Sequence, residues 1–214
     1  HSVTGVQTCA LPILSIGVQS FTPRHLAALG RVHDAAEARA TAAAAVELFD
    51  EVNLDLMFAL PKQSVDDALA DVEEALMFRT THLSCYELTI EPNTAFHRHP
   101  PERPDEDEAD AMQSAIAARL AQAGFDRYEV SAYAKPGHRS AHNVNYWRFG
   151  DYLGIGAGAH GKVSMPDRIV REVRWKQPKQ YLERALADEP VMERREVEPG
   201  ELGFEFMLNA LRLS

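Results

Sequence analysis

Short apolar segments alternate with helix-forming segments over the first 125 residues, and this order limits the fold more than any other feature of the chain. The apolar segments are LSIGVQ at 14–19, VNLDLMF at 52–58 and LSCYELTI at 83–90, each of a length typical of a strand. Strands that alternate with helices form βαβ units and a parallel sheet, either open or closed into a barrel. The sequence therefore predicts an α/β fold.

The helices are predicted from their start signals and their apolar spacing. Thr22 as N-cap, with Pro23 at the first helical position, opens a helix that Gly30 ends. Ser64 caps another helix, in which apolar residues recur at spacings of four and three over 65–76. Two further helices are predicted over 35–49 and from about 105 to 124.

The second half of the chain is less regular. RYEVSAYA at 127–134 indicates one more strand, and an aromatic segment at 142–147 leads into the glycine-rich YLGIGAGAHG at 152–161. From about Met165 onward the chain is charged and helical in tendency, with a possible helix entry at 177–179.

The first residues differ from the rest. HSVTGVQTCALPI at 1–13 has neither the basic start nor the sustained apolar stretch of a signal peptide. We therefore expect a non-native leader, and this expectation excludes Cys9 as a ligand.

Composition excludes several classes of protein. No stretch approaches the roughly 20 apolar residues that cross a bilayer. The net charge of −10 and the lack of clustered Lys and Arg argue against nucleic-acid binding. Two cysteines, Cys9 and Cys85, are too few for a disulfide framework, so we expect the reducing cytoplasm. Cys85, inside an apolar strand, is most simply a small buried residue.

Polar residues lie late in, or just after, three of the predicted strands. They are Gln19, Asp55 and Thr89. Open parallel sheets and barrels both place their sites at the carboxyl ends of strands, so these residues indicate a binding site. The alternative is that Gln19 and Asp55 cap neighbouring helices or pair within the core.

The aromatic and glycine-rich segments each allow two interpretations. HNVNYW at 142–147 can bind a flat, partly apolar ligand, or it can form a structural corner whose side chains bond the backbone. The glycines of 152–161 resemble a dinucleotide fingerprint only weakly, because Pro166 interrupts any following helix; a tight strand and turn is preferred. His138 and His142 are four residues apart, but Pro136 and Gly137 argue against a helical metal site.

Other catalytic motifs are absent from the sequence. It contains no GxSxG, HExxH, Walker loop or CxxC pair. Hydrolase and ATPase functions therefore have no support.

Seven segments together carry a family resemblance. They are SIGVQSF (15–21), LGRVH (29–33), NLDLMFALPKQ (53–63), HLSCYELTIEPNT (82–94), YEVSAYAKPG (128–137), HNVNYWRFGDYLGIGAGAHGK (142–162) and QP (177–178). In this order they resemble the heme chaperone family of the radical S-adenosylmethionine superfamily, which is related to oxygen-independent coproporphyrinogen III oxidase. The resemblance runs from about Leu14 to the end of the chain.

The resemblance implies a particular fold and cofactor. Residues 14–164 would form the C-terminal part of a (β/α) barrel, and 165–214 the start of a C-terminal helical domain. S-adenosylmethionine would lie across the carboxyl strand ends, beside a [4Fe–4S] cluster. Five residues match the positions that contact S-adenosylmethionine in the family: Gln19, Arg31, Asp55, Thr89 and His160. Their chemistry agrees, because Asp55 can accept from ribose hydroxyls and Arg31 can bind a carboxylate.

The resemblance also implies heme as a ligand. HNVNYW matches an HNxxYW motif typical of the chaperone branch, whose members bind heme and deliver it to acceptor proteins. His142 is then the candidate iron ligand, with Asn143, Asn145, Tyr146 and Trp147 as further heme-binding candidates.

The chain departs from the family in three respects. The CxxxCxxC motif that binds the cluster is absent, as is the glycine-rich strand that holds the methionine amino group. Both precede the equivalent of Leu14 in relatives, so we expect a truncated fragment that cannot bind the cluster or act as an enzyme alone. Ala59 also stands where the family usually has glycine.

We therefore predict heme binding and delivery as the function of the intact protein. One alternative is the oxidase reaction, in which a 5′-deoxyadenosyl radical starts the decarboxylation of porphyrinogen propionates and HNVNYW is only structural. An alternative from another class is a catalytically silent α/β binding domain, in which Gln19 and Asp55 satisfy the core.

Overall fold

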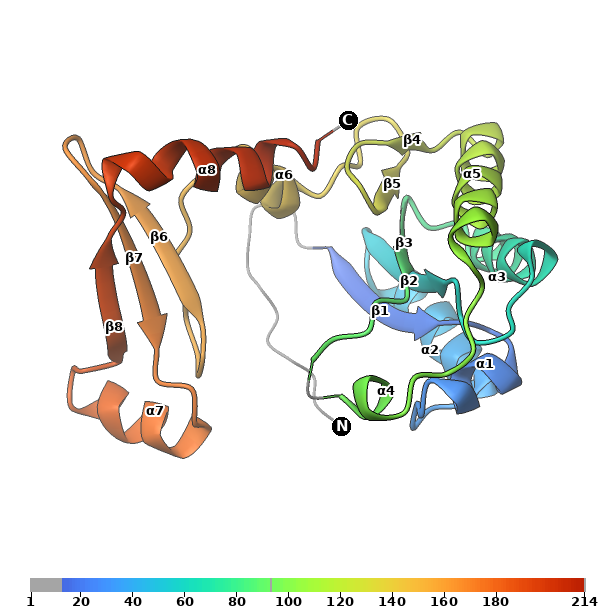
Figure 1. The fold of residues 1–214 in the computed structure, drawn as a ribbon, viewed down its shortest axis with the longest axis horizontal. Helices are drawn as coiled ribbons and strands as arrows, with labels where there is room; N and C mark the ends of the chain where they lie inside the picture. Colours follow the sequence, from blue (N-terminus) through green and yellow to red (C-terminus); the bar gives the residue numbers. More distant parts are fainter. Residues whose placement is uncertain (1–12, 93, 214) are drawn as a thin grey trace. The chain divides into compact units, whose positions relative to one another are not determined.

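The computed structural model describes residues 13–92 and 94–213, and these form two compact units that divide after residue 140 (Figure 1). The suggested leader, with Cys9, lies outside the described residues except for Ile13. The sequence analysis placed the end of the barrel part at 164, whereas the second unit begins at Ala141. The functional assignment of the two parts stays a prediction.

The first unit is built on a mixed sheet with the strand order β1-β2-β3-β5-β4. Strands β1, β2 and β3 are parallel, as predicted, while β5 is antiparallel to both β3 and β4. The strands are β1 (Leu14–Gln19), β2 (Val52–Phe58), β3 (His82–Glu87), β4 (Asp126–Arg127) and β5 (Ala132–Ala134).

Two strand predictions need correction. The strand predicted over 83–90 ends at Glu87. The single strand predicted over 127–134 is wrong, because the chain turns back within it. Tyr128 N–H donates to the carbonyl of Ala132, and the Arg127 guanidinium donates to the carbonyl of Val130 at 2.7 Å. These bonds make a short hairpin of β4 and β5.

Three helices of the first unit begin where the sequence predicts. Each starts with a capping box, in which the N-cap side chain and the third helical residue bond each other's backbone N–H: Asp34 with Glu37, Ser64 with Asp67, and Asp105 with Glu108. The helices of this unit are α1 (Pro23–Ala28), α2 (Ala35–Leu48), α3 (Val65–Met77), α4 (Ala95–Arg98) and α5 (Glu106–Gln122).

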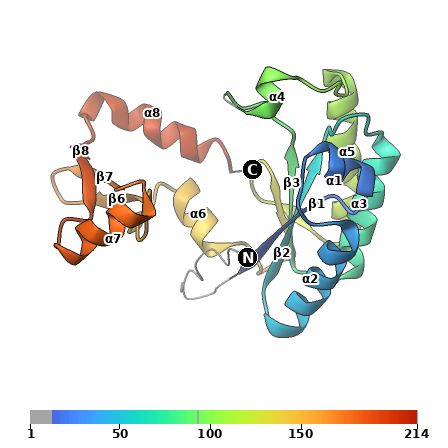
Figure 2. The same cartoon turned by 90° about the horizontal axis from the view of Figure 1, so that it is seen from below.

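Helices α2, α3 and α5 cover one face of the strands (Figure 2). Small residues of α2, such as Ala42 and Ala45, pack with Leu54 and Leu83 of the sheet in one hydrophobic core. Cys85 belongs to this core, as expected, and burial raises the pKa of its thiol to about 12. The core fixes which face of the sheet is left for polar side chains.

The second unit contains an antiparallel sheet of order β6-β7-β8. The helical tendency expected after Met165 is wrong for two of these strands, because the segments at 169–174 and 191–196 pair with each other as antiparallel strands. Pro178 does open a helix, as predicted. The elements are α6 (Ala141–Trp147), β6 (His160–Ser164), β7 (Ile169–Arg174), α7 (Pro178–Leu186), β8 (Val191–Glu196) and α8 (Pro199–Ala210).

Within the described ranges, none of the helices has the length and apolar character that a membrane span requires.

Candidate functional site

The face of the first sheet that is turned away from the core carries polar side chains. Successive residues of a strand point to opposite faces, so Leu54 and Leu56 enter the core while Asn53 and Asp55 lie on the other face. The parallel register sets Ser15, Asn53 and His82 in one row and Gly17, Asp55 and Ser84 in the next. The result is a polar surface in the middle of the sheet.

Asp55 is bonded through both carboxylate oxygens. Ser15 Oγ donates to Oδ2 at 2.7 Å, and Asn53 Nδ2 donates to Oδ1 at 2.8 Å. Burial raises the pKa of Asp55, and the hydrogen bonds from Ser15 and Asn53 oppose that rise. Each carboxylate oxygen has more than one acceptor site, so Asp55 can still accept from the hydroxyls of a ligand.

Gln19 and Arg31 converge on Gly17, which lies beside Asp55 in the sheet register. A Cβ added at Gly17 would lie 2.7 Å from Gln19 Nε2 and 3.3 Å from a terminal nitrogen of Arg31. Gln19 has a φ of 68°, a left-handed conformation that is uncommon for a residue other than glycine. The Arg31 side chain has no hydrogen bond or ion pair among the described residues. This arrangement offers an amide, a guanidinium and a carboxylate to one small region.

Thr89 and His160 are placed differently. Thr89 follows β3, is exposed, and donates its hydroxyl to Glu91 at 3.1 Å, so it lies at the carboxyl ends of the parallel strands. His160 is the first residue of β6 and belongs to the second unit. The structure thus brings Gln19, Arg31 and Asp55 together and puts Thr89 at the carboxyl edge of the same sheet.

The described parts of the chain contain no group of three or more His, Cys, Asp or Glu residues that could hold a metal ion. His138 precedes α6 and bonds Glu51 Oε1 through Nδ1 at 2.7 Å, whereas His142 lies within α6. His138 and His142 therefore do not lie on one helix.

HNVNYW forms most of the short helix α6 rather than an irregular corner. Asn145 nevertheless has the backbone role that a corner would require: its Nδ2 donates to the carbonyl of Asp151 at 2.9 Å, and its own carbonyl accepts from Gly150 N–H at 2.7 Å. A Cβ at Gly150 would lie 2.8 Å from that carbonyl oxygen, so only glycine fits this close turn. Asn145 is therefore tied to the chain that follows α6.

Two other residues of this motif line a cavity of about 220 Å³ in the second unit. Tyr146 stacks edge-on against Tyr152 with ring centroids 4.6 Å apart, and Arg212 lies 4.3 Å above the ring of Trp147. The indole Nε1 of Trp147 is buried and has no hydrogen-bond partner among the described residues. The lining residues are Tyr146, Trp147, Phe149, Gly150, Tyr152, Lys162, Arg171 and Asn209. Small-molecule pockets usually measure about 300–1,000 Å³, so this cavity fits part of a large flat ligand at most.

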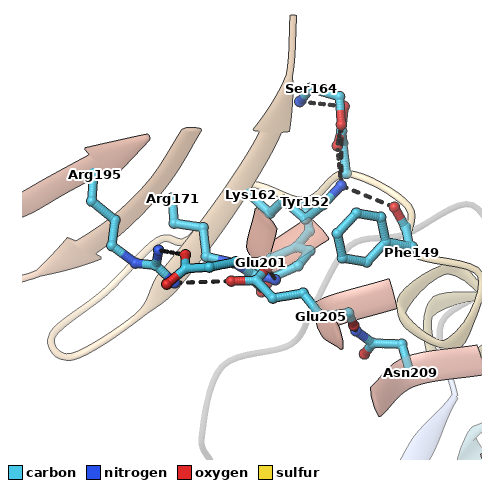
Figure 3. A network of polar contacts seen from close by, with 10 residues as sticks. Phe149, Tyr152, Lys162, Ser164, Arg171, Arg195, Glu201, Glu205 and Asn209 are labelled. Carbon is cyan, nitrogen blue, oxygen red and sulfur yellow. Dashed lines mark hydrogen bonds and ion pairs between the residues drawn. The ribbon is translucent and has the colours of Figure 1, made fainter. Parts of the chain in front are cut away.

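The two cations of the cavity are held by fixed partners (Figure 3). Lys162 is fully buried and donates to the carbonyl of Phe149 and to Asp151 Oδ1, both at 2.9 Å. Arg171 donates to Glu205 at 2.7 Å and to the hydroxyl of Tyr152 at 3.2 Å. These bonds make the cavity wall rigid and close to neutral.

His142 and Asn143, at the start of α6, are half-buried and do not line this cavity. Burial lowers the pKa of His142 and so favours the neutral imidazole. That is the form of histidine that binds a metal ion. The candidate heme residues therefore divide between the cavity, the turn after α6 and the start of the helix.

The sequence analysis missed several polar residues of both units. Ser15 and Asn53 bond Asp55, His82 and Ser84 bond Asn53, and Lys162 and Arg171 line the cavity. Polar residues recur at alternate positions of VNLDLMF and HLSCYE, and this pattern could have identified the sheet face that is turned away from the core. Nothing local marks Lys162 as buried.

Comparison with known proteins gives several extensive matches, although no family model matches the chain. The heme chaperone HemW of Escherichia coli K12 is 46% identical over 202 residues, which cover 94% of this chain and 52% of that protein. HemW of Haemophilus influenzae is 44% identical over 98% of this chain and 54% of its own length. A mitochondrial radical S-adenosyl methionine domain-containing protein of Mus musculus is 43% identical over 70% of this chain. The chain spans about half the length of the two HemW proteins.

A solved structure supports the fold. Coproporphyrinogen III oxidase (HemN) from Escherichia coli, described as a radical SAM enzyme, matches with a TM-score of 0.74 and 19% identity, over 94% of this chain and 49% of its own. This likeness confirms the predicted α/β class and shows that the chain shares about half of the fold of that enzyme.

Proposed function

We propose that the whole protein binds heme and delivers it to acceptor proteins. The reason is that the chain belongs to the family of the heme chaperone HemW and spans about half the length of those proteins. The observation that carries this proposal is the 46% identity to a named heme chaperone over 94% of the chain. A location in the cytoplasm agrees with this role.

S-adenosylmethionine is the proposed cofactor of the first unit. Its carboxylate can pair with Arg31, its ribose hydroxyls can donate to Asp55, and Gln19 offers an amide beside both. Thr89 at the carboxyl strand ends belongs to the proposed set, and His160, in the second unit, is included only because it matches a contact position in the family. The donor and acceptor types around Gly17 fit this ligand.

The iron–sulfur cluster of the family does not fit the residues present. The sequence has no CxxxCxxC motif, and the single cysteine within the described residues, Cys85, is buried in the core with a raised pKa. We therefore assign no residue of this chain to cluster binding.

Heme is the proposed ligand of the α6 region. His142 would ligate the iron as a neutral imidazole, while the aromatic side chains of Tyr146 and Trp147 offer apolar contacts. Asn143 and Asn145 would support this site, the latter by holding the turn after α6.

The proposal can be tested by titrating the full-length protein with heme and following the Soret absorbance. We expect stoichiometric binding that His142→Ala weakens and that His97→Ala, a change in an exposed histidine of the short helix α4, leaves unchanged. Coproporphyrinogen decarboxylation is assayed in parallel. Decarboxylation without heme binding would make the oxidase the correct function. The absence of both heme binding and decarboxylation would support a silent binding domain.

A further inference from the structure

A chain of hydrogen bonds continues from Asp55 into the interior of the first unit. Asn53 Nδ2 lies 2.8 Å from Asp55 Oδ1, and Asn53 Oδ1 lies 2.7 Å from His82 Nδ1. On its other side, His82 Nε2 lies 2.6 Å from the hydroxyl of Tyr128. Asn53, His82 and Tyr128 are all buried. Four side chains from β2, β3 and the segment after β4 therefore form one connected row.

The chemistry of these groups fixes the direction of each bond. The ionised Asp55 can only accept, so the Asn53 amide must present its Nδ2 to the carboxylate and its Oδ1 to His82. Asn53 Oδ1 can only accept, which assigns a proton to Nδ1 of His82, and with a neutral imidazole Nε2 then accepts from Tyr128. Every donor in the row thus points toward Asp55.

The hydroxyl groups of Ser15 and Ser84 hold the amide of Asn53 in this orientation. Asn53 Nδ2 also donates to Ser15 Oγ at 2.6 Å, and Ser84 Oγ donates to Asn53 Oδ1 at 3.1 Å. A flipped amide would turn Asn53 Oδ1 toward the Asp55 carboxylate, so that two acceptors would face each other and Asp55 would lose its donor. The network therefore permits one orientation of Asn53 only.

We propose that Asn53, His82 and Tyr128 are positioning residues for the ribose of S-adenosylmethionine, because they hold the Asp55 carboxylate aligned to accept from the ribose hydroxyls. The inference rests on the proposed function, in which Asp55 contacts that ribose. The amide of Asn53 does not ionise and its oxygen carries no proton, so the row acts through orientation rather than through proton transfer.

The experiment measures binding of S-adenosylmethionine, and of its analogue without the two ribose hydroxyls, by equilibrium dialysis against the full-length protein. Asn53→Asp keeps the shape and the acceptor for His82 but removes the donors and adds a like charge beside Asp55. We expect it to weaken S-adenosylmethionine by about 10- to 100-fold, the range for a hydrogen bond to a charged group, and to leave the analogue within about twofold.

A second substitution makes the test independent of how well the first variant folds. Tyr128→Phe removes only the hydroxyl that bonds His82, and we expect about threefold weaker S-adenosylmethionine binding with no change for the analogue. Tyr133→Phe is the matched control, because Tyr133 is a buried tyrosine of β5 that packs in the core, and it should change neither affinity.

Asp55→Asn distinguishes the proposed ribose contact of Asp55 from the proposed positioning role of its neighbours. If Asp55→Asn leaves S-adenosylmethionine binding unchanged, the proposed ribose contact itself is wrong. If Asp55→Asn weakens binding but Asn53→Asp and Tyr128→Phe do not, the positioning role is wrong and the proposed site stands. Equal weakening of both ligands by Asn53→Asp would show a role in folding alone and would also overturn the inference.

Discussion

The Ser20 hydroxyl donates a hydrogen bond of 2.7 Å to Asp71, so a carboxylate of α3 holds the turn that follows β1. The same carboxylate accepts from the backbone N–H of Phe21 at 2.8 Å. Gln19, a proposed S-adenosylmethionine contact, directly precedes this turn. The conformation of Gln19 is therefore tied to a helix 50 residues away along the chain.

Asp71 makes stability depend on pH. Burial raises its pKa to about 6, although hydrogen bonds from Ser20 and Phe21 oppose the rise. Because the folded pKa exceeds the unfolded value, the contribution of protonated Asp71 to folding stability is fully present below about pH 4. That contribution is lost as the pH rises through 6. Asp71→Asn should remove that loss, about 3 kcal/mol over this window.

Urea unfolding of the Asp71→Asn variant and the wild type at pH 4, 5, 6 and 7 checks this prediction. The exposed Asp66→Asn, on the same helix, serves as the control. Parallel stability curves for wild type and Asp71→Asn would contradict the raised pKa.

Glu51 and His138 join the start of β2 to the segment before α6. Burial alone would raise the pKa of Glu51, but hydrogen bonds from Thr81 and His138 outweigh it and lower the pKa. The stabilisation is therefore present above about pH 4.5 and disappears as pH falls below it. A double-mutant cycle with Glu51→Gln and His138→Ala should give a coupling of about 0.5–1 kcal/mol at pH 6, since both groups are partly exposed. A coupling that persists at pH 3 would show that the carboxylate charge is not its source.

Gly154 is required by the close approach of two backbone segments. A Cβ there would lie 2.6 Å from the carbonyl carbon of His160. Gly154→Ala should cost about 2 kcal/mol or more, because backbone cannot move aside as a flexible side chain can. Gly203→Ala is the matched control: no atom lies within 4 Å of its added Cβ, so it should stabilise α8 by about 0.5–1 kcal/mol. Denaturant unfolding of both variants measures the difference, and equal effects would refute the packing argument.

Lys162 holds the segment from Phe149 to Asp151 against β6. Burial alone would raise the pKa of Asp151, but hydrogen bonds from Lys162 and Ser164 lower it to about 2. Lys162→Met should destabilise the protein by about 2 kcal/mol near neutral pH, since buried acceptors lose their donor while Asp151 is partly solvated.

The loss of stability caused by Lys162→Met should become smaller as the pH falls. A lowered folded pKa means that the stabilisation is present above about pH 4 and is lost as pH falls toward 2. Thermal unfolding of Lys162→Met at several pH values measures this effect, with Lys176→Met, a change in an exposed lysine, as the control. Similar melting temperatures for the two variants at pH 7 would contradict a stabilising role of Lys162.

Local signals predicted much of the first unit. Ser64 with Asp67 and Asp105 with Glu108 lie three residues apart and mark the starts of α3 and α5 in the sequence. The antiparallel end of the sheet was not predicted, because the turn between β4 and β5 depends on Arg127 reaching the carbonyl of Val130. Strands β7 and β8 were expected to be helical because charged residues such as Arg171 and Arg195 fill many of their positions and no apolar alternation marks them.

The sequence by itself determined the alternation of strands and helices from β1 to β3 and the polar residues that β1 and β2 carry, because each of these depends on neighbours a few positions apart. Only the tertiary structure decided which side chains surround Asp55. His82 is 29 residues from Asn53, and Tyr128 is 46 residues from His82. No local preference joins such distant residues, and the register of the packed strands places them within hydrogen-bond distance.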